Sequence, residues 1–132
     1  MQRGSENQPL KTAVVFFAHG SSISSANEAV KTVARLAASK GGFELWEPAF
    51  LEGGRPDLAG AVASLASQGA RRIAVVPYFL TLGLHLQRDL PRLIADISKQ
   101  YPDIEIVCGD PLDGHAGLVE ILAERARQTC GQ

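Results

Sequence analysis

Runs of hydrophobic residues alternate along the chain with segments in which hydrophobic residues recur every three to four positions. The runs predict four strands, over residues 12–18, 43–51, 72–76 and 104–108. The first run is almost continuously apolar, which is typical of a strand buried on both faces of a parallel sheet. The second contains Glu44, Glu47 and Pro48, which favour an edge position. Pro77 follows the third run and is expected to end that strand, because it has no N–H.

Capping residues and glycines delimit the first two predicted helices. Ser25 and Glu28 have the spacing of a capping box, and Gly41-Gly42 ends the helix that begins there. Pro56 is expected at the first helical position of the second helix, which Gly69 ends.

The last two helices follow the third and fourth strands. Asp89 and Pro91 suggest the start of the third helix, although a start nearer His85 is also open. Tyr101 begins the segment that ends this helix. The fourth helix is expected to bury four residues at helical spacing: Leu118, Ile121, Leu122 and Ala126.

Four strand–helix units predict a three-layer α/β fold, with a parallel sheet, helices on both of its faces and right-handed crossovers. The 132 residues suit one domain over residues 11–130. Residues 1–10 read as a loose polar leader without the hydrophobic region of a signal peptide. A composition of 45% hydrophobic and 20% charged residues is ordinary for a globular domain.

The net charge of the chain does not favour nucleic acid or a membrane as a binding partner. A net charge of −1 gives no overall attraction to nucleic acid or an anionic membrane, and no apolar run is long enough to span a bilayer. Cys108 and Cys130 belong to no CxxC pair, and a disulfide between them is not expected in a reducing compartment. We therefore expect a cytoplasmic domain that binds any anionic substrate through a local arrangement.

All three histidines follow predicted strands. His19, His85 and His115 lie there, as does Glu52. Ligands of parallel sheets bind beyond the carboxyl ends of the strands, so these side chains fall on the ligand side. Neutral imidazole binds divalent iron, cobalt, nickel, copper and zinc. Two imidazoles and one carboxylate would leave coordination positions open, which favours transient binding or catalysis over a structural site.

The loop after the third strand is unusually apolar. Leu80, Leu82 and Leu84 alternate around Gly83, next to His85. Such a loop is expected to pack against a flat apolar ligand or another subunit, unless its leucines only close the core.

Two other kinds of site stay open from the residues alone. The Gly20-Ser21-Ser22 turn is able to hold a phosphate at a helix N-terminus, which would suit a bare phosphate-binding domain. A hydrolase triad of Ser21, a histidine and Asp110 is disfavoured, because the chain has no GxSxG motif.

Three motifs resemble those of the sirohydrochlorin chelatases. They are His19-Gly20-Ser21 after the first strand, Ala49-Phe50-Leu51-Glu52 after the second, and Pro-Tyr-Phe-Leu-x-x-Gly-x-His-x-x-x-Asp-x-Pro over residues 77–91. The likeness runs from about residue 12 to residue 127. Within this family the chain is most similar to the short, single-domain cobaltochelatases of cobalamin biosynthesis (class II chelatases).

The resemblance implies a flavodoxin-like sheet of strand order 2-1-3-4 and a homodimer that encloses a cleft. It implies that His19 and His85 handle the metal, and Glu52 matches the acidic residue of the family motif. His115 lies where the family often has a His-Pro pair, but Ala116 replaces the proline here. We therefore expect His115 to begin the last helix rather than to bind metal.

The implied reaction is insertion of Co²⁺ into sirohydrochlorin with release of two protons. His19 and His85 would bind the metal or accept the protons, and Glu52 would relay them. The macrocycle would lie flat on four residues of the apolar loop: Phe79, Leu80, Leu82 and Leu84.

The carboxylates of such a substrate would be met by Arg55, Arg88, and the Gly20-Ser21-Ser22 backbone, although both arginines could equally be solvated surface charges. The metal would be a substrate, and no permanently bound cofactor is expected. Fe²⁺ or Ni²⁺ in place of Co²⁺, and precorrin-2 in place of sirohydrochlorin, stay open. The rival from another class is a metal or tetrapyrrole carrier without turnover. The leucines of the apolar loop favour a homodimer, because they would form an unusual patch on a monomer.

Overall fold

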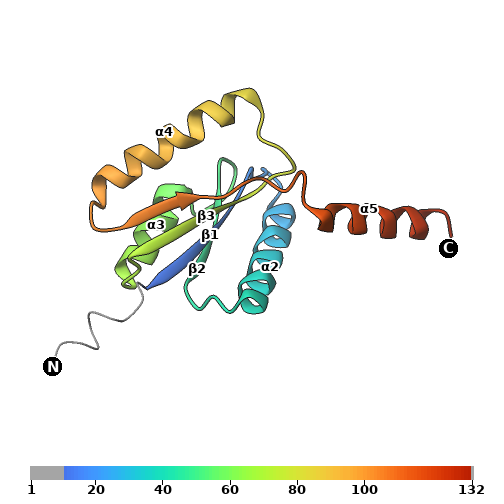
Figure 1. Ribbon diagram of the computed structural model, residues 1–132, viewed down its shortest axis with the longest axis horizontal. Helices are drawn as coiled ribbons and strands as arrows, with labels where there is room; N and C mark the ends of the chain where they lie inside the picture. The colour runs from blue at the N-terminus through green and yellow to red at the C-terminus, as the bar shows by residue number, and fades with distance from the viewer. Residues whose placement is uncertain (1–10, 132) are drawn as a thin grey trace.

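A computed structural model describes residues 11–131, in which strands and helices alternate (Figure 1). The elements are β1 (Thr12–Ala18), α2 (Ser24–Gly41), β2 (Trp46–Phe50), α3 (Leu58–Ser67), β3 (Arg72–Tyr78), α4 (Leu84–Gln100), β4 (Glu105–Cys108) and α5 (Ala116–Thr129). The leader predicted over residues 1–10 lies outside the described residues. No helix among residues 11–131 combines the length and hydropathy needed to cross a bilayer.

The four strands form one parallel sheet in the order β2-β1-β3-β4, which confirms the predicted fold class and strand order. The Glu- and Pro-containing strand β2 is at an edge, as predicted. Ala18, the last residue of β1, lies opposite Phe50 of β2 and Tyr78 of β3. The three loops that follow these strands therefore leave the sheet side by side.

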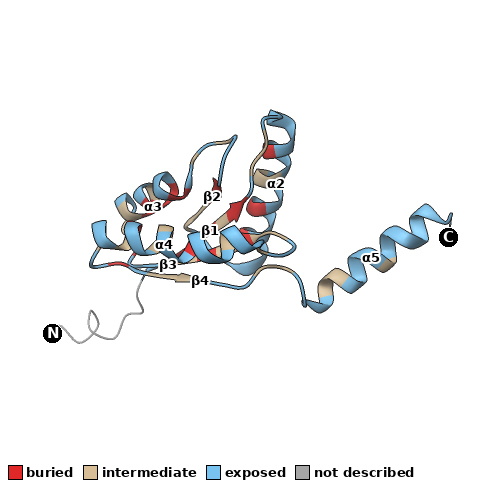
Figure 2. Ribbon diagram, turned by 90° about the horizontal axis from the view of Figure 1, so that it is seen from above, coloured by how far each residue is buried: buried red, intermediate tan, exposed pale blue. Residues whose placement is uncertain are grey.

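Helices cover the two faces of the sheet to different extents. On one face, α3 and α4 bury a hydrophobic core that includes Phe17, Leu65, Ile73 and Leu90. On the other face, α2 packs against β1 and β2. Figure 2 shows the buried residues concentrated in this sandwich of β1, β2, β3, α2 and α3.

Two helices begin elsewhere than their capping patterns predict. The N-cap of α2 is Ile23, and the Ser25–Glu28 capping box does not form. Instead, the Ile23 N–H donates to Oγ of Ser21 (3.0 Å), which fixes the start of the helix two residues earlier. The N-cap of α3 is Asp57, whose carboxylate accepts from the Gly60 N–H (2.8 Å), so Pro56 lies before the helix.

Strand β3 continues through Pro77 to Tyr78, so the prediction that Pro77 ends it is wrong. The Val75 carbonyl accepts from the Gly109 N–H (2.9 Å), on the side of β4. Residues two apart in a strand point their backbone groups to the same side. An N–H at position 77 would therefore point toward β4, but β4 has already ended at Cys108. The N–H that Pro77 lacks is thus not needed for pairing with β4.

Helix α4 begins at Leu84 with Gly83 as its N-cap, so the start nearer His85 is confirmed. Pro91 lies inside the helix instead of opening it. On the side of α4 that faces the core, Leu90 and Ile97 are buried.

Helix α5 departs most from the prediction, because none of its residues is buried. Ile121 and Leu122 are 54% and 67% exposed, Ala126 is exposed and Leu118 is only half-buried. In both Figure 1 and Figure 2, α5 projects away from the rest of the molecule and does not fold back over the sheet.

Candidate functional site

The loops after β1 and β2 are joined by two backbone hydrogen bonds just beyond the last paired residues of the strands. The Leu51 N–H donates to the Ala18 carbonyl (2.9 Å), and the Glu52 N–H donates to the His19 carbonyl (3.0 Å). This brings Nδ1 of His19 within 3.9 Å of Oε1 of Glu52. Both side chains are exposed, at 61% and 69%, so their electrostatic attraction is screened by water.

Asn27 on α2 holds these two loops together, and it is the one buried polar residue among those described. Its Oδ1 accepts from the Ser21 N–H (3.0 Å). Its Nδ2 donates to the Ser21 carbonyl (2.8 Å) and to the Gly53 carbonyl (2.9 Å). Sequence reasoning missed Asn27. The available signal was one amide at the start of a helix whose other inward positions are apolar.

Glycines allow the two loops to approach closely. Gly20 has φ +90°, and a Cβ there would overlap the Glu52 carbonyl. A Cβ on Gly53 would lie 2.7 Å from the Ser21 backbone. The His19–Ser21 turn and the Glu52–Gly53 turn therefore form one rigid support for the imidazole of His19.

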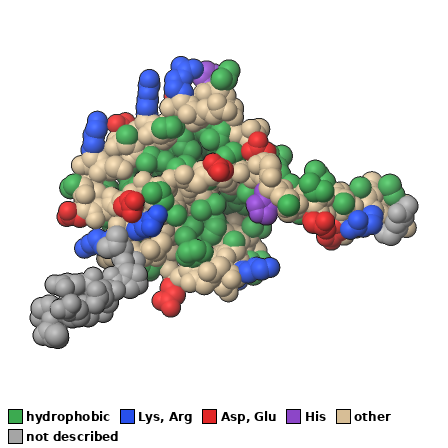
Figure 3. Space-filling view, viewed as in Figure 1, with side chains coloured by type: hydrophobic (Ala, Val, Ile, Leu, Met, Phe, Trp, Pro, Cys, Tyr) green, Lys and Arg blue, Asp and Glu red, His purple; other side chains and the backbone are tan. Residues whose placement is uncertain are grey.

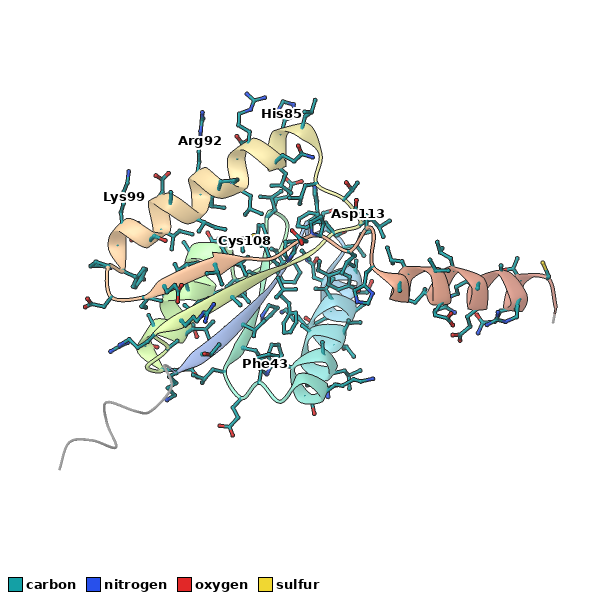
Figure 4. All side chains as sticks on the ribbon, viewed as in Figure 1. Phe43, His85, Arg92, Lys99, Cys108 and Asp113 are labelled. Carbon is teal, nitrogen blue, oxygen red and sulfur yellow. The ribbon has the colours of Figure 1, made fainter. Side chains whose placement is uncertain are left out.

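His19 and His85 line the same open hollow, of about 380 Å³, at the carboxyl edge of the sheet. Phe79, Leu51 and Leu84 supply much of its apolar lining. His85 stands on the first turn of α4 and points outward on the same side of the helix as Arg92 and Lys99 (Figure 4). The predicted pair of imidazoles thus shares one hollow, with His85 at its outer rim.

The surroundings of His19 leave one ring nitrogen available. Nδ1 lies 3.3 Å from the Gly20 carbonyl and faces Glu52, which favours the tautomer with the proton on Nδ1. Nε2 then keeps its lone pair. The ring also meets the edge of Phe79, with centroids 6.3 Å apart and planes at 76°. Phe79 in turn packs on the core through Phe17, at 5.8 Å.

The four predicted macrocycle contacts do not all lie in this hollow. Phe79 and Leu84 line it, but Leu80 is 65% exposed outside it. Leu82 turns toward Leu90 and lines a separate hollow of about 330 Å³ under α4. Leu82 therefore helps to close the core, which was the alternative left open for these leucines.

The predicted anion-binding residues are also separated. Arg55 lines an adjacent hollow of about 440 Å³ together with Glu52 and Gly53. Arg88 is exposed on α4 and does not line the histidine hollow.

In the Gly20-Ser21-Ser22 turn, the Ser21 N–H is bonded to Asn27 and the Ile23 N–H to Ser21 itself. Neither N–H is free to donate to a phosphate bound at this turn, which weakens the phosphate-binding alternative.

His115 lies at the start of α5, as expected. It is the N-cap, and its Nδ1 accepts from the Gly117 N–H (2.8 Å). This bond gives the imidazole a structural role outside the hollow.

One chain does not assemble a complete metal centre within residues 11–131. No three His, Cys, Asp or Glu side chains among them are placed to hold one ion. The expected set of two imidazoles and one carboxylate is therefore present as a close pair, His19 with Glu52, and a separate His85. Cys108 and Cys130 are free, as expected. Partial burial raises the pKa of the Cys108 thiol, and the Asp110 carboxylate adds to this effect, so Cys108 stays protonated at neutral pH.

We predict that Asn27→Ala lowers the free energy of unfolding by about 1–3 kcal/mol, because it leaves the Ser21 N–H and the Gly53 carbonyl without their partner. Urea denaturation measures the change. Ser25→Ala is the matched control on the same helix and should alter stability by less than about 0.5 kcal/mol, since Ser25 caps nothing. Equal effects of the two variants would show that Asn27 does not hold the loops.

Known proteins share the sequence and the fold of this chain. The CbiX family profile matches residues 13–129. The chain is 29% identical to the sirohydrochlorin cobaltochelatase of Methanopyrus kandleri, over 91% of this chain and 98% of that protein. It is 30% identical to the chloroplastic sirohydrochlorin ferrochelatase of Arabidopsis thaliana, over 85% of this chain but only 50% of that protein. The chain thus spans about half the length of the plant relative.

A solved structure has the same fold. The sirohydrochlorin chelatase SirB from Bacillus subtilis subspecies spizizenii, in complex with cobalt, superposes with a TM-score of 0.84 and 28% identity, over 90% of this chain and 51% of that one. With a family profile that covers nearly all of the described residues, and with the predicted sheet order and histidine hollow in place, the chain belongs to the CbiX family.

Proposed function

We propose that this protein is a sirohydrochlorin chelatase that inserts Co²⁺ into the tetrapyrrole and releases two protons, as a step of cobalamin biosynthesis. The observation that carries the proposal is the open apolar hollow lined by both His19 and His85. A planar macrocycle needs an apolar surface beside it, and metal insertion needs ligands that release the ion again. Two exposed imidazoles, without a third protein ligand among residues 11–131, suit such transient binding.

In this proposal His19 and His85 have different roles in binding the metal and accepting the protons. Nε2 of His19 has a free lone pair when Nδ1 holds its proton, so it is able to bind the ion or accept a pyrrole proton. Glu52, 3.9 Å from Nδ1, stabilises the positive charge that His19 gains when it accepts a proton. His85 at the outer rim receives the ion from solvent. The metal is a substrate in this scheme, and the chain needs no permanently bound cofactor.

The substrate carboxylates are bound at the edges of the hollow. The N-cap of α4, Gly83, has no side chain to accept a hydrogen bond, so the first N–H groups of the helix and its dipole attract anions beside Leu84 and His85. Arg55 and Arg88 extend this positive surface from the neighbouring hollow and from α4. The Gly20-Ser21-Ser22 turn contributes mainly by supporting His19, because its Ser21 N–H is already bonded.

Cobalt is the proposed metal because the chain covers almost the whole length of an archaeal relative named as a cobaltochelatase, and about half of a relative named as a ferrochelatase. Fe²⁺ is the second candidate, and Ni²⁺ the third. We also propose a homodimer, because Leu80 and Leu84 at the carboxyl edge are 65% and 79% exposed. The two free thiols suit a cytoplasmic location.

The test of the proposal is the visible spectrum of sirohydrochlorin mixed with Co²⁺, followed with and without the purified protein. We expect the spectral change of metal insertion to be accelerated in proportion to the amount of protein. Parallel assays with Fe²⁺ and Ni²⁺ rank the metals. A protein that binds Co²⁺ or the tetrapyrrole but leaves the insertion rate unchanged would be a carrier, and the chelatase proposal would be rejected.

His85→Ala should lower the insertion rate at least about 100-fold, because it removes one of the two imidazoles of the hollow. The matched control is His115→Asn, which removes an imidazole at the same edge but keeps an acceptor for the Gly117 N–H. This control should keep its activity. Circular dichroism should show both variants folded. Full activity of His85→Ala would exclude His85 from the reaction.

Glu52→Gln keeps the size of the side chain and removes its charge. We expect kcat to fall about 10-fold with little change in the KM for Co²⁺, because the carboxylate stabilises protonated His19 rather than binding the ion. Glu44→Gln, at an exposed position before β2, is the control for the loss of one surface charge. A large rise in the KM for Co²⁺ would instead assign Glu52 to the metal.

A further inference from the structure

Among the described residues, the hollow of His19 and His85 is lined by one carboxylate, which the proposed reaction does not use. This carboxylate belongs to Asp89, which lines the hollow together with both histidines. Glu52, the carboxylate beside Nδ1 of His19, lines the adjacent hollow instead. The hollow itself therefore offers an entering ion the carboxylate of Asp89, whereas Glu52 acts from beside it.

Asp89 lies one turn after His85 on α4, on the side of His85 that faces the sheet. A helix turns about 100° per residue, so position 89 is offset from position 85 by only about 40°. Leu86, which packs against the core, lies further round in the same direction. The outer side of the helix carries His85, Arg92 and Lys99 (Figure 4), and Lys and Arg side chains stand along it in Figure 3. Asp89 is thus placed between the basic outer side of α4 and its buried side.

The Asp89 carboxylate has no partner within residues 11–131. It is exposed and forms no hydrogen bond or ion pair there, although α4 also carries arginines. By contrast, Asp96 on the same helix forms an ion pair with Lys99 (3.8 Å). The acceptor lone pairs of Asp89 are therefore available to a ligand that enters the hollow.

We infer that His85 and Asp89 together form a capture site, a two-ligand chelate that takes up the divalent metal ion before its insertion; this role rests on the proposed function. Side chains four residues apart on a helix have Cβ atoms about 5–6 Å apart, so their donor atoms are able to converge on one ion. The two histidines of the HExxH motif bind zinc at the same spacing. Divalent first-row metals bind both imidazole nitrogen and carboxylate oxygen.

A chelate of two ligands suits an ion that must be passed on. Two donors hold the ion more tightly than His85 alone, and its other coordination positions stay open to water and then to the pyrrole nitrogens. No third side chain within residues 11–131 completes the site and traps the ion. The carboxylate also offsets part of the charge that the ion brings to an apolar hollow. With the ion on His85 and Asp89, Nε2 of His19 is free to accept a pyrrole proton.

The first test is a calorimetric titration of the full chain with CoCl₂, without tetrapyrrole, in a Cys108→Ser, Cys130→Ser background that removes competing thiols. We expect Asp89→Asn to raise the Kd for Co²⁺ at least about 10-fold, because one of two donors is lost, and His85→Ala to raise it by a similar factor. Asp96→Asn, the matched control on α4, should keep the Kd of the background protein. An unchanged Kd in Asp89→Asn or His85→Ala, or an equal rise in Asp96→Asn, would overturn the inference.

Asp89→His distinguishes a metal ligand from a mere negative charge. This variant places a second imidazole four residues after His85, so it restores two donors at the same spacing and removes the carboxylate. We expect the Kd for Co²⁺ to return to the value of the background protein or to fall below it. A Kd as high as that of Asp89→Asn would show that Asp89 attracts the ion only by its charge, and the chelate would be rejected.

The insertion assay tests the same assignment by separating KM from kcat. Asp89→Asn should raise the KM for Co²⁺ about 10-fold with little change in kcat, the opposite of the result expected for Glu52→Gln. A fall in kcat at an unchanged KM would assign Asp89 to proton transfer and overturn the capture site. The titration needs no turnover, so a chain that binds Co²⁺ at this pair without inserting it would retain the capture site and reject the chelatase proposal.

Discussion

The site depends on the position of β1 between β2 and β3 in a parallel sheet. Because Ala18 is in register with both Phe50 and Tyr78, the next residue of each strand leaves the sheet at the same level. His19 is thereby held between the Leu51–Glu52 turn and Phe79. The amide of Asn27 and the close approach of Gly20 and Gly53 then fix the His19 backbone, so the imidazole needs no rigid contacts of its own and stays open to solvent.

Hydrophobic patterning was enough to predict the four strands, the edge position of β2 and the grouping of the histidines at one edge, because these follow from burial and from parallel pairing. The sheet order came from the resemblance. Two local patterns gave wrong boundaries. The bond from the Ile23 N–H to Ser21 set the start of α2 in place of the Ser25–Glu28 box, and the short β4 left room for Pro77 inside β3. Asn27 was missed because its three bonds reach loops that only the fold brings together.

The exposure of α5 is the largest difference from the sequence prediction. The periodicity of α5 correctly identified an apolar side, but periodicity does not say which chain covers it. The homodimer proposed above would cover the exposed Leu80 and Leu84 of the carboxyl edge.

The most direct measurement of the central claim is anomalous diffraction at the cobalt edge from a crystal of the protein soaked with Co²⁺. A hollow built for metal insertion should show a peak next to the imidazole of His19, with His85 of the same chain or of the partner on the ion. Peaks confined to the thiols of Cys108 and Cys130 or to His115, or no peak at all, would contradict a metal site between the first and third strand–helix junctions.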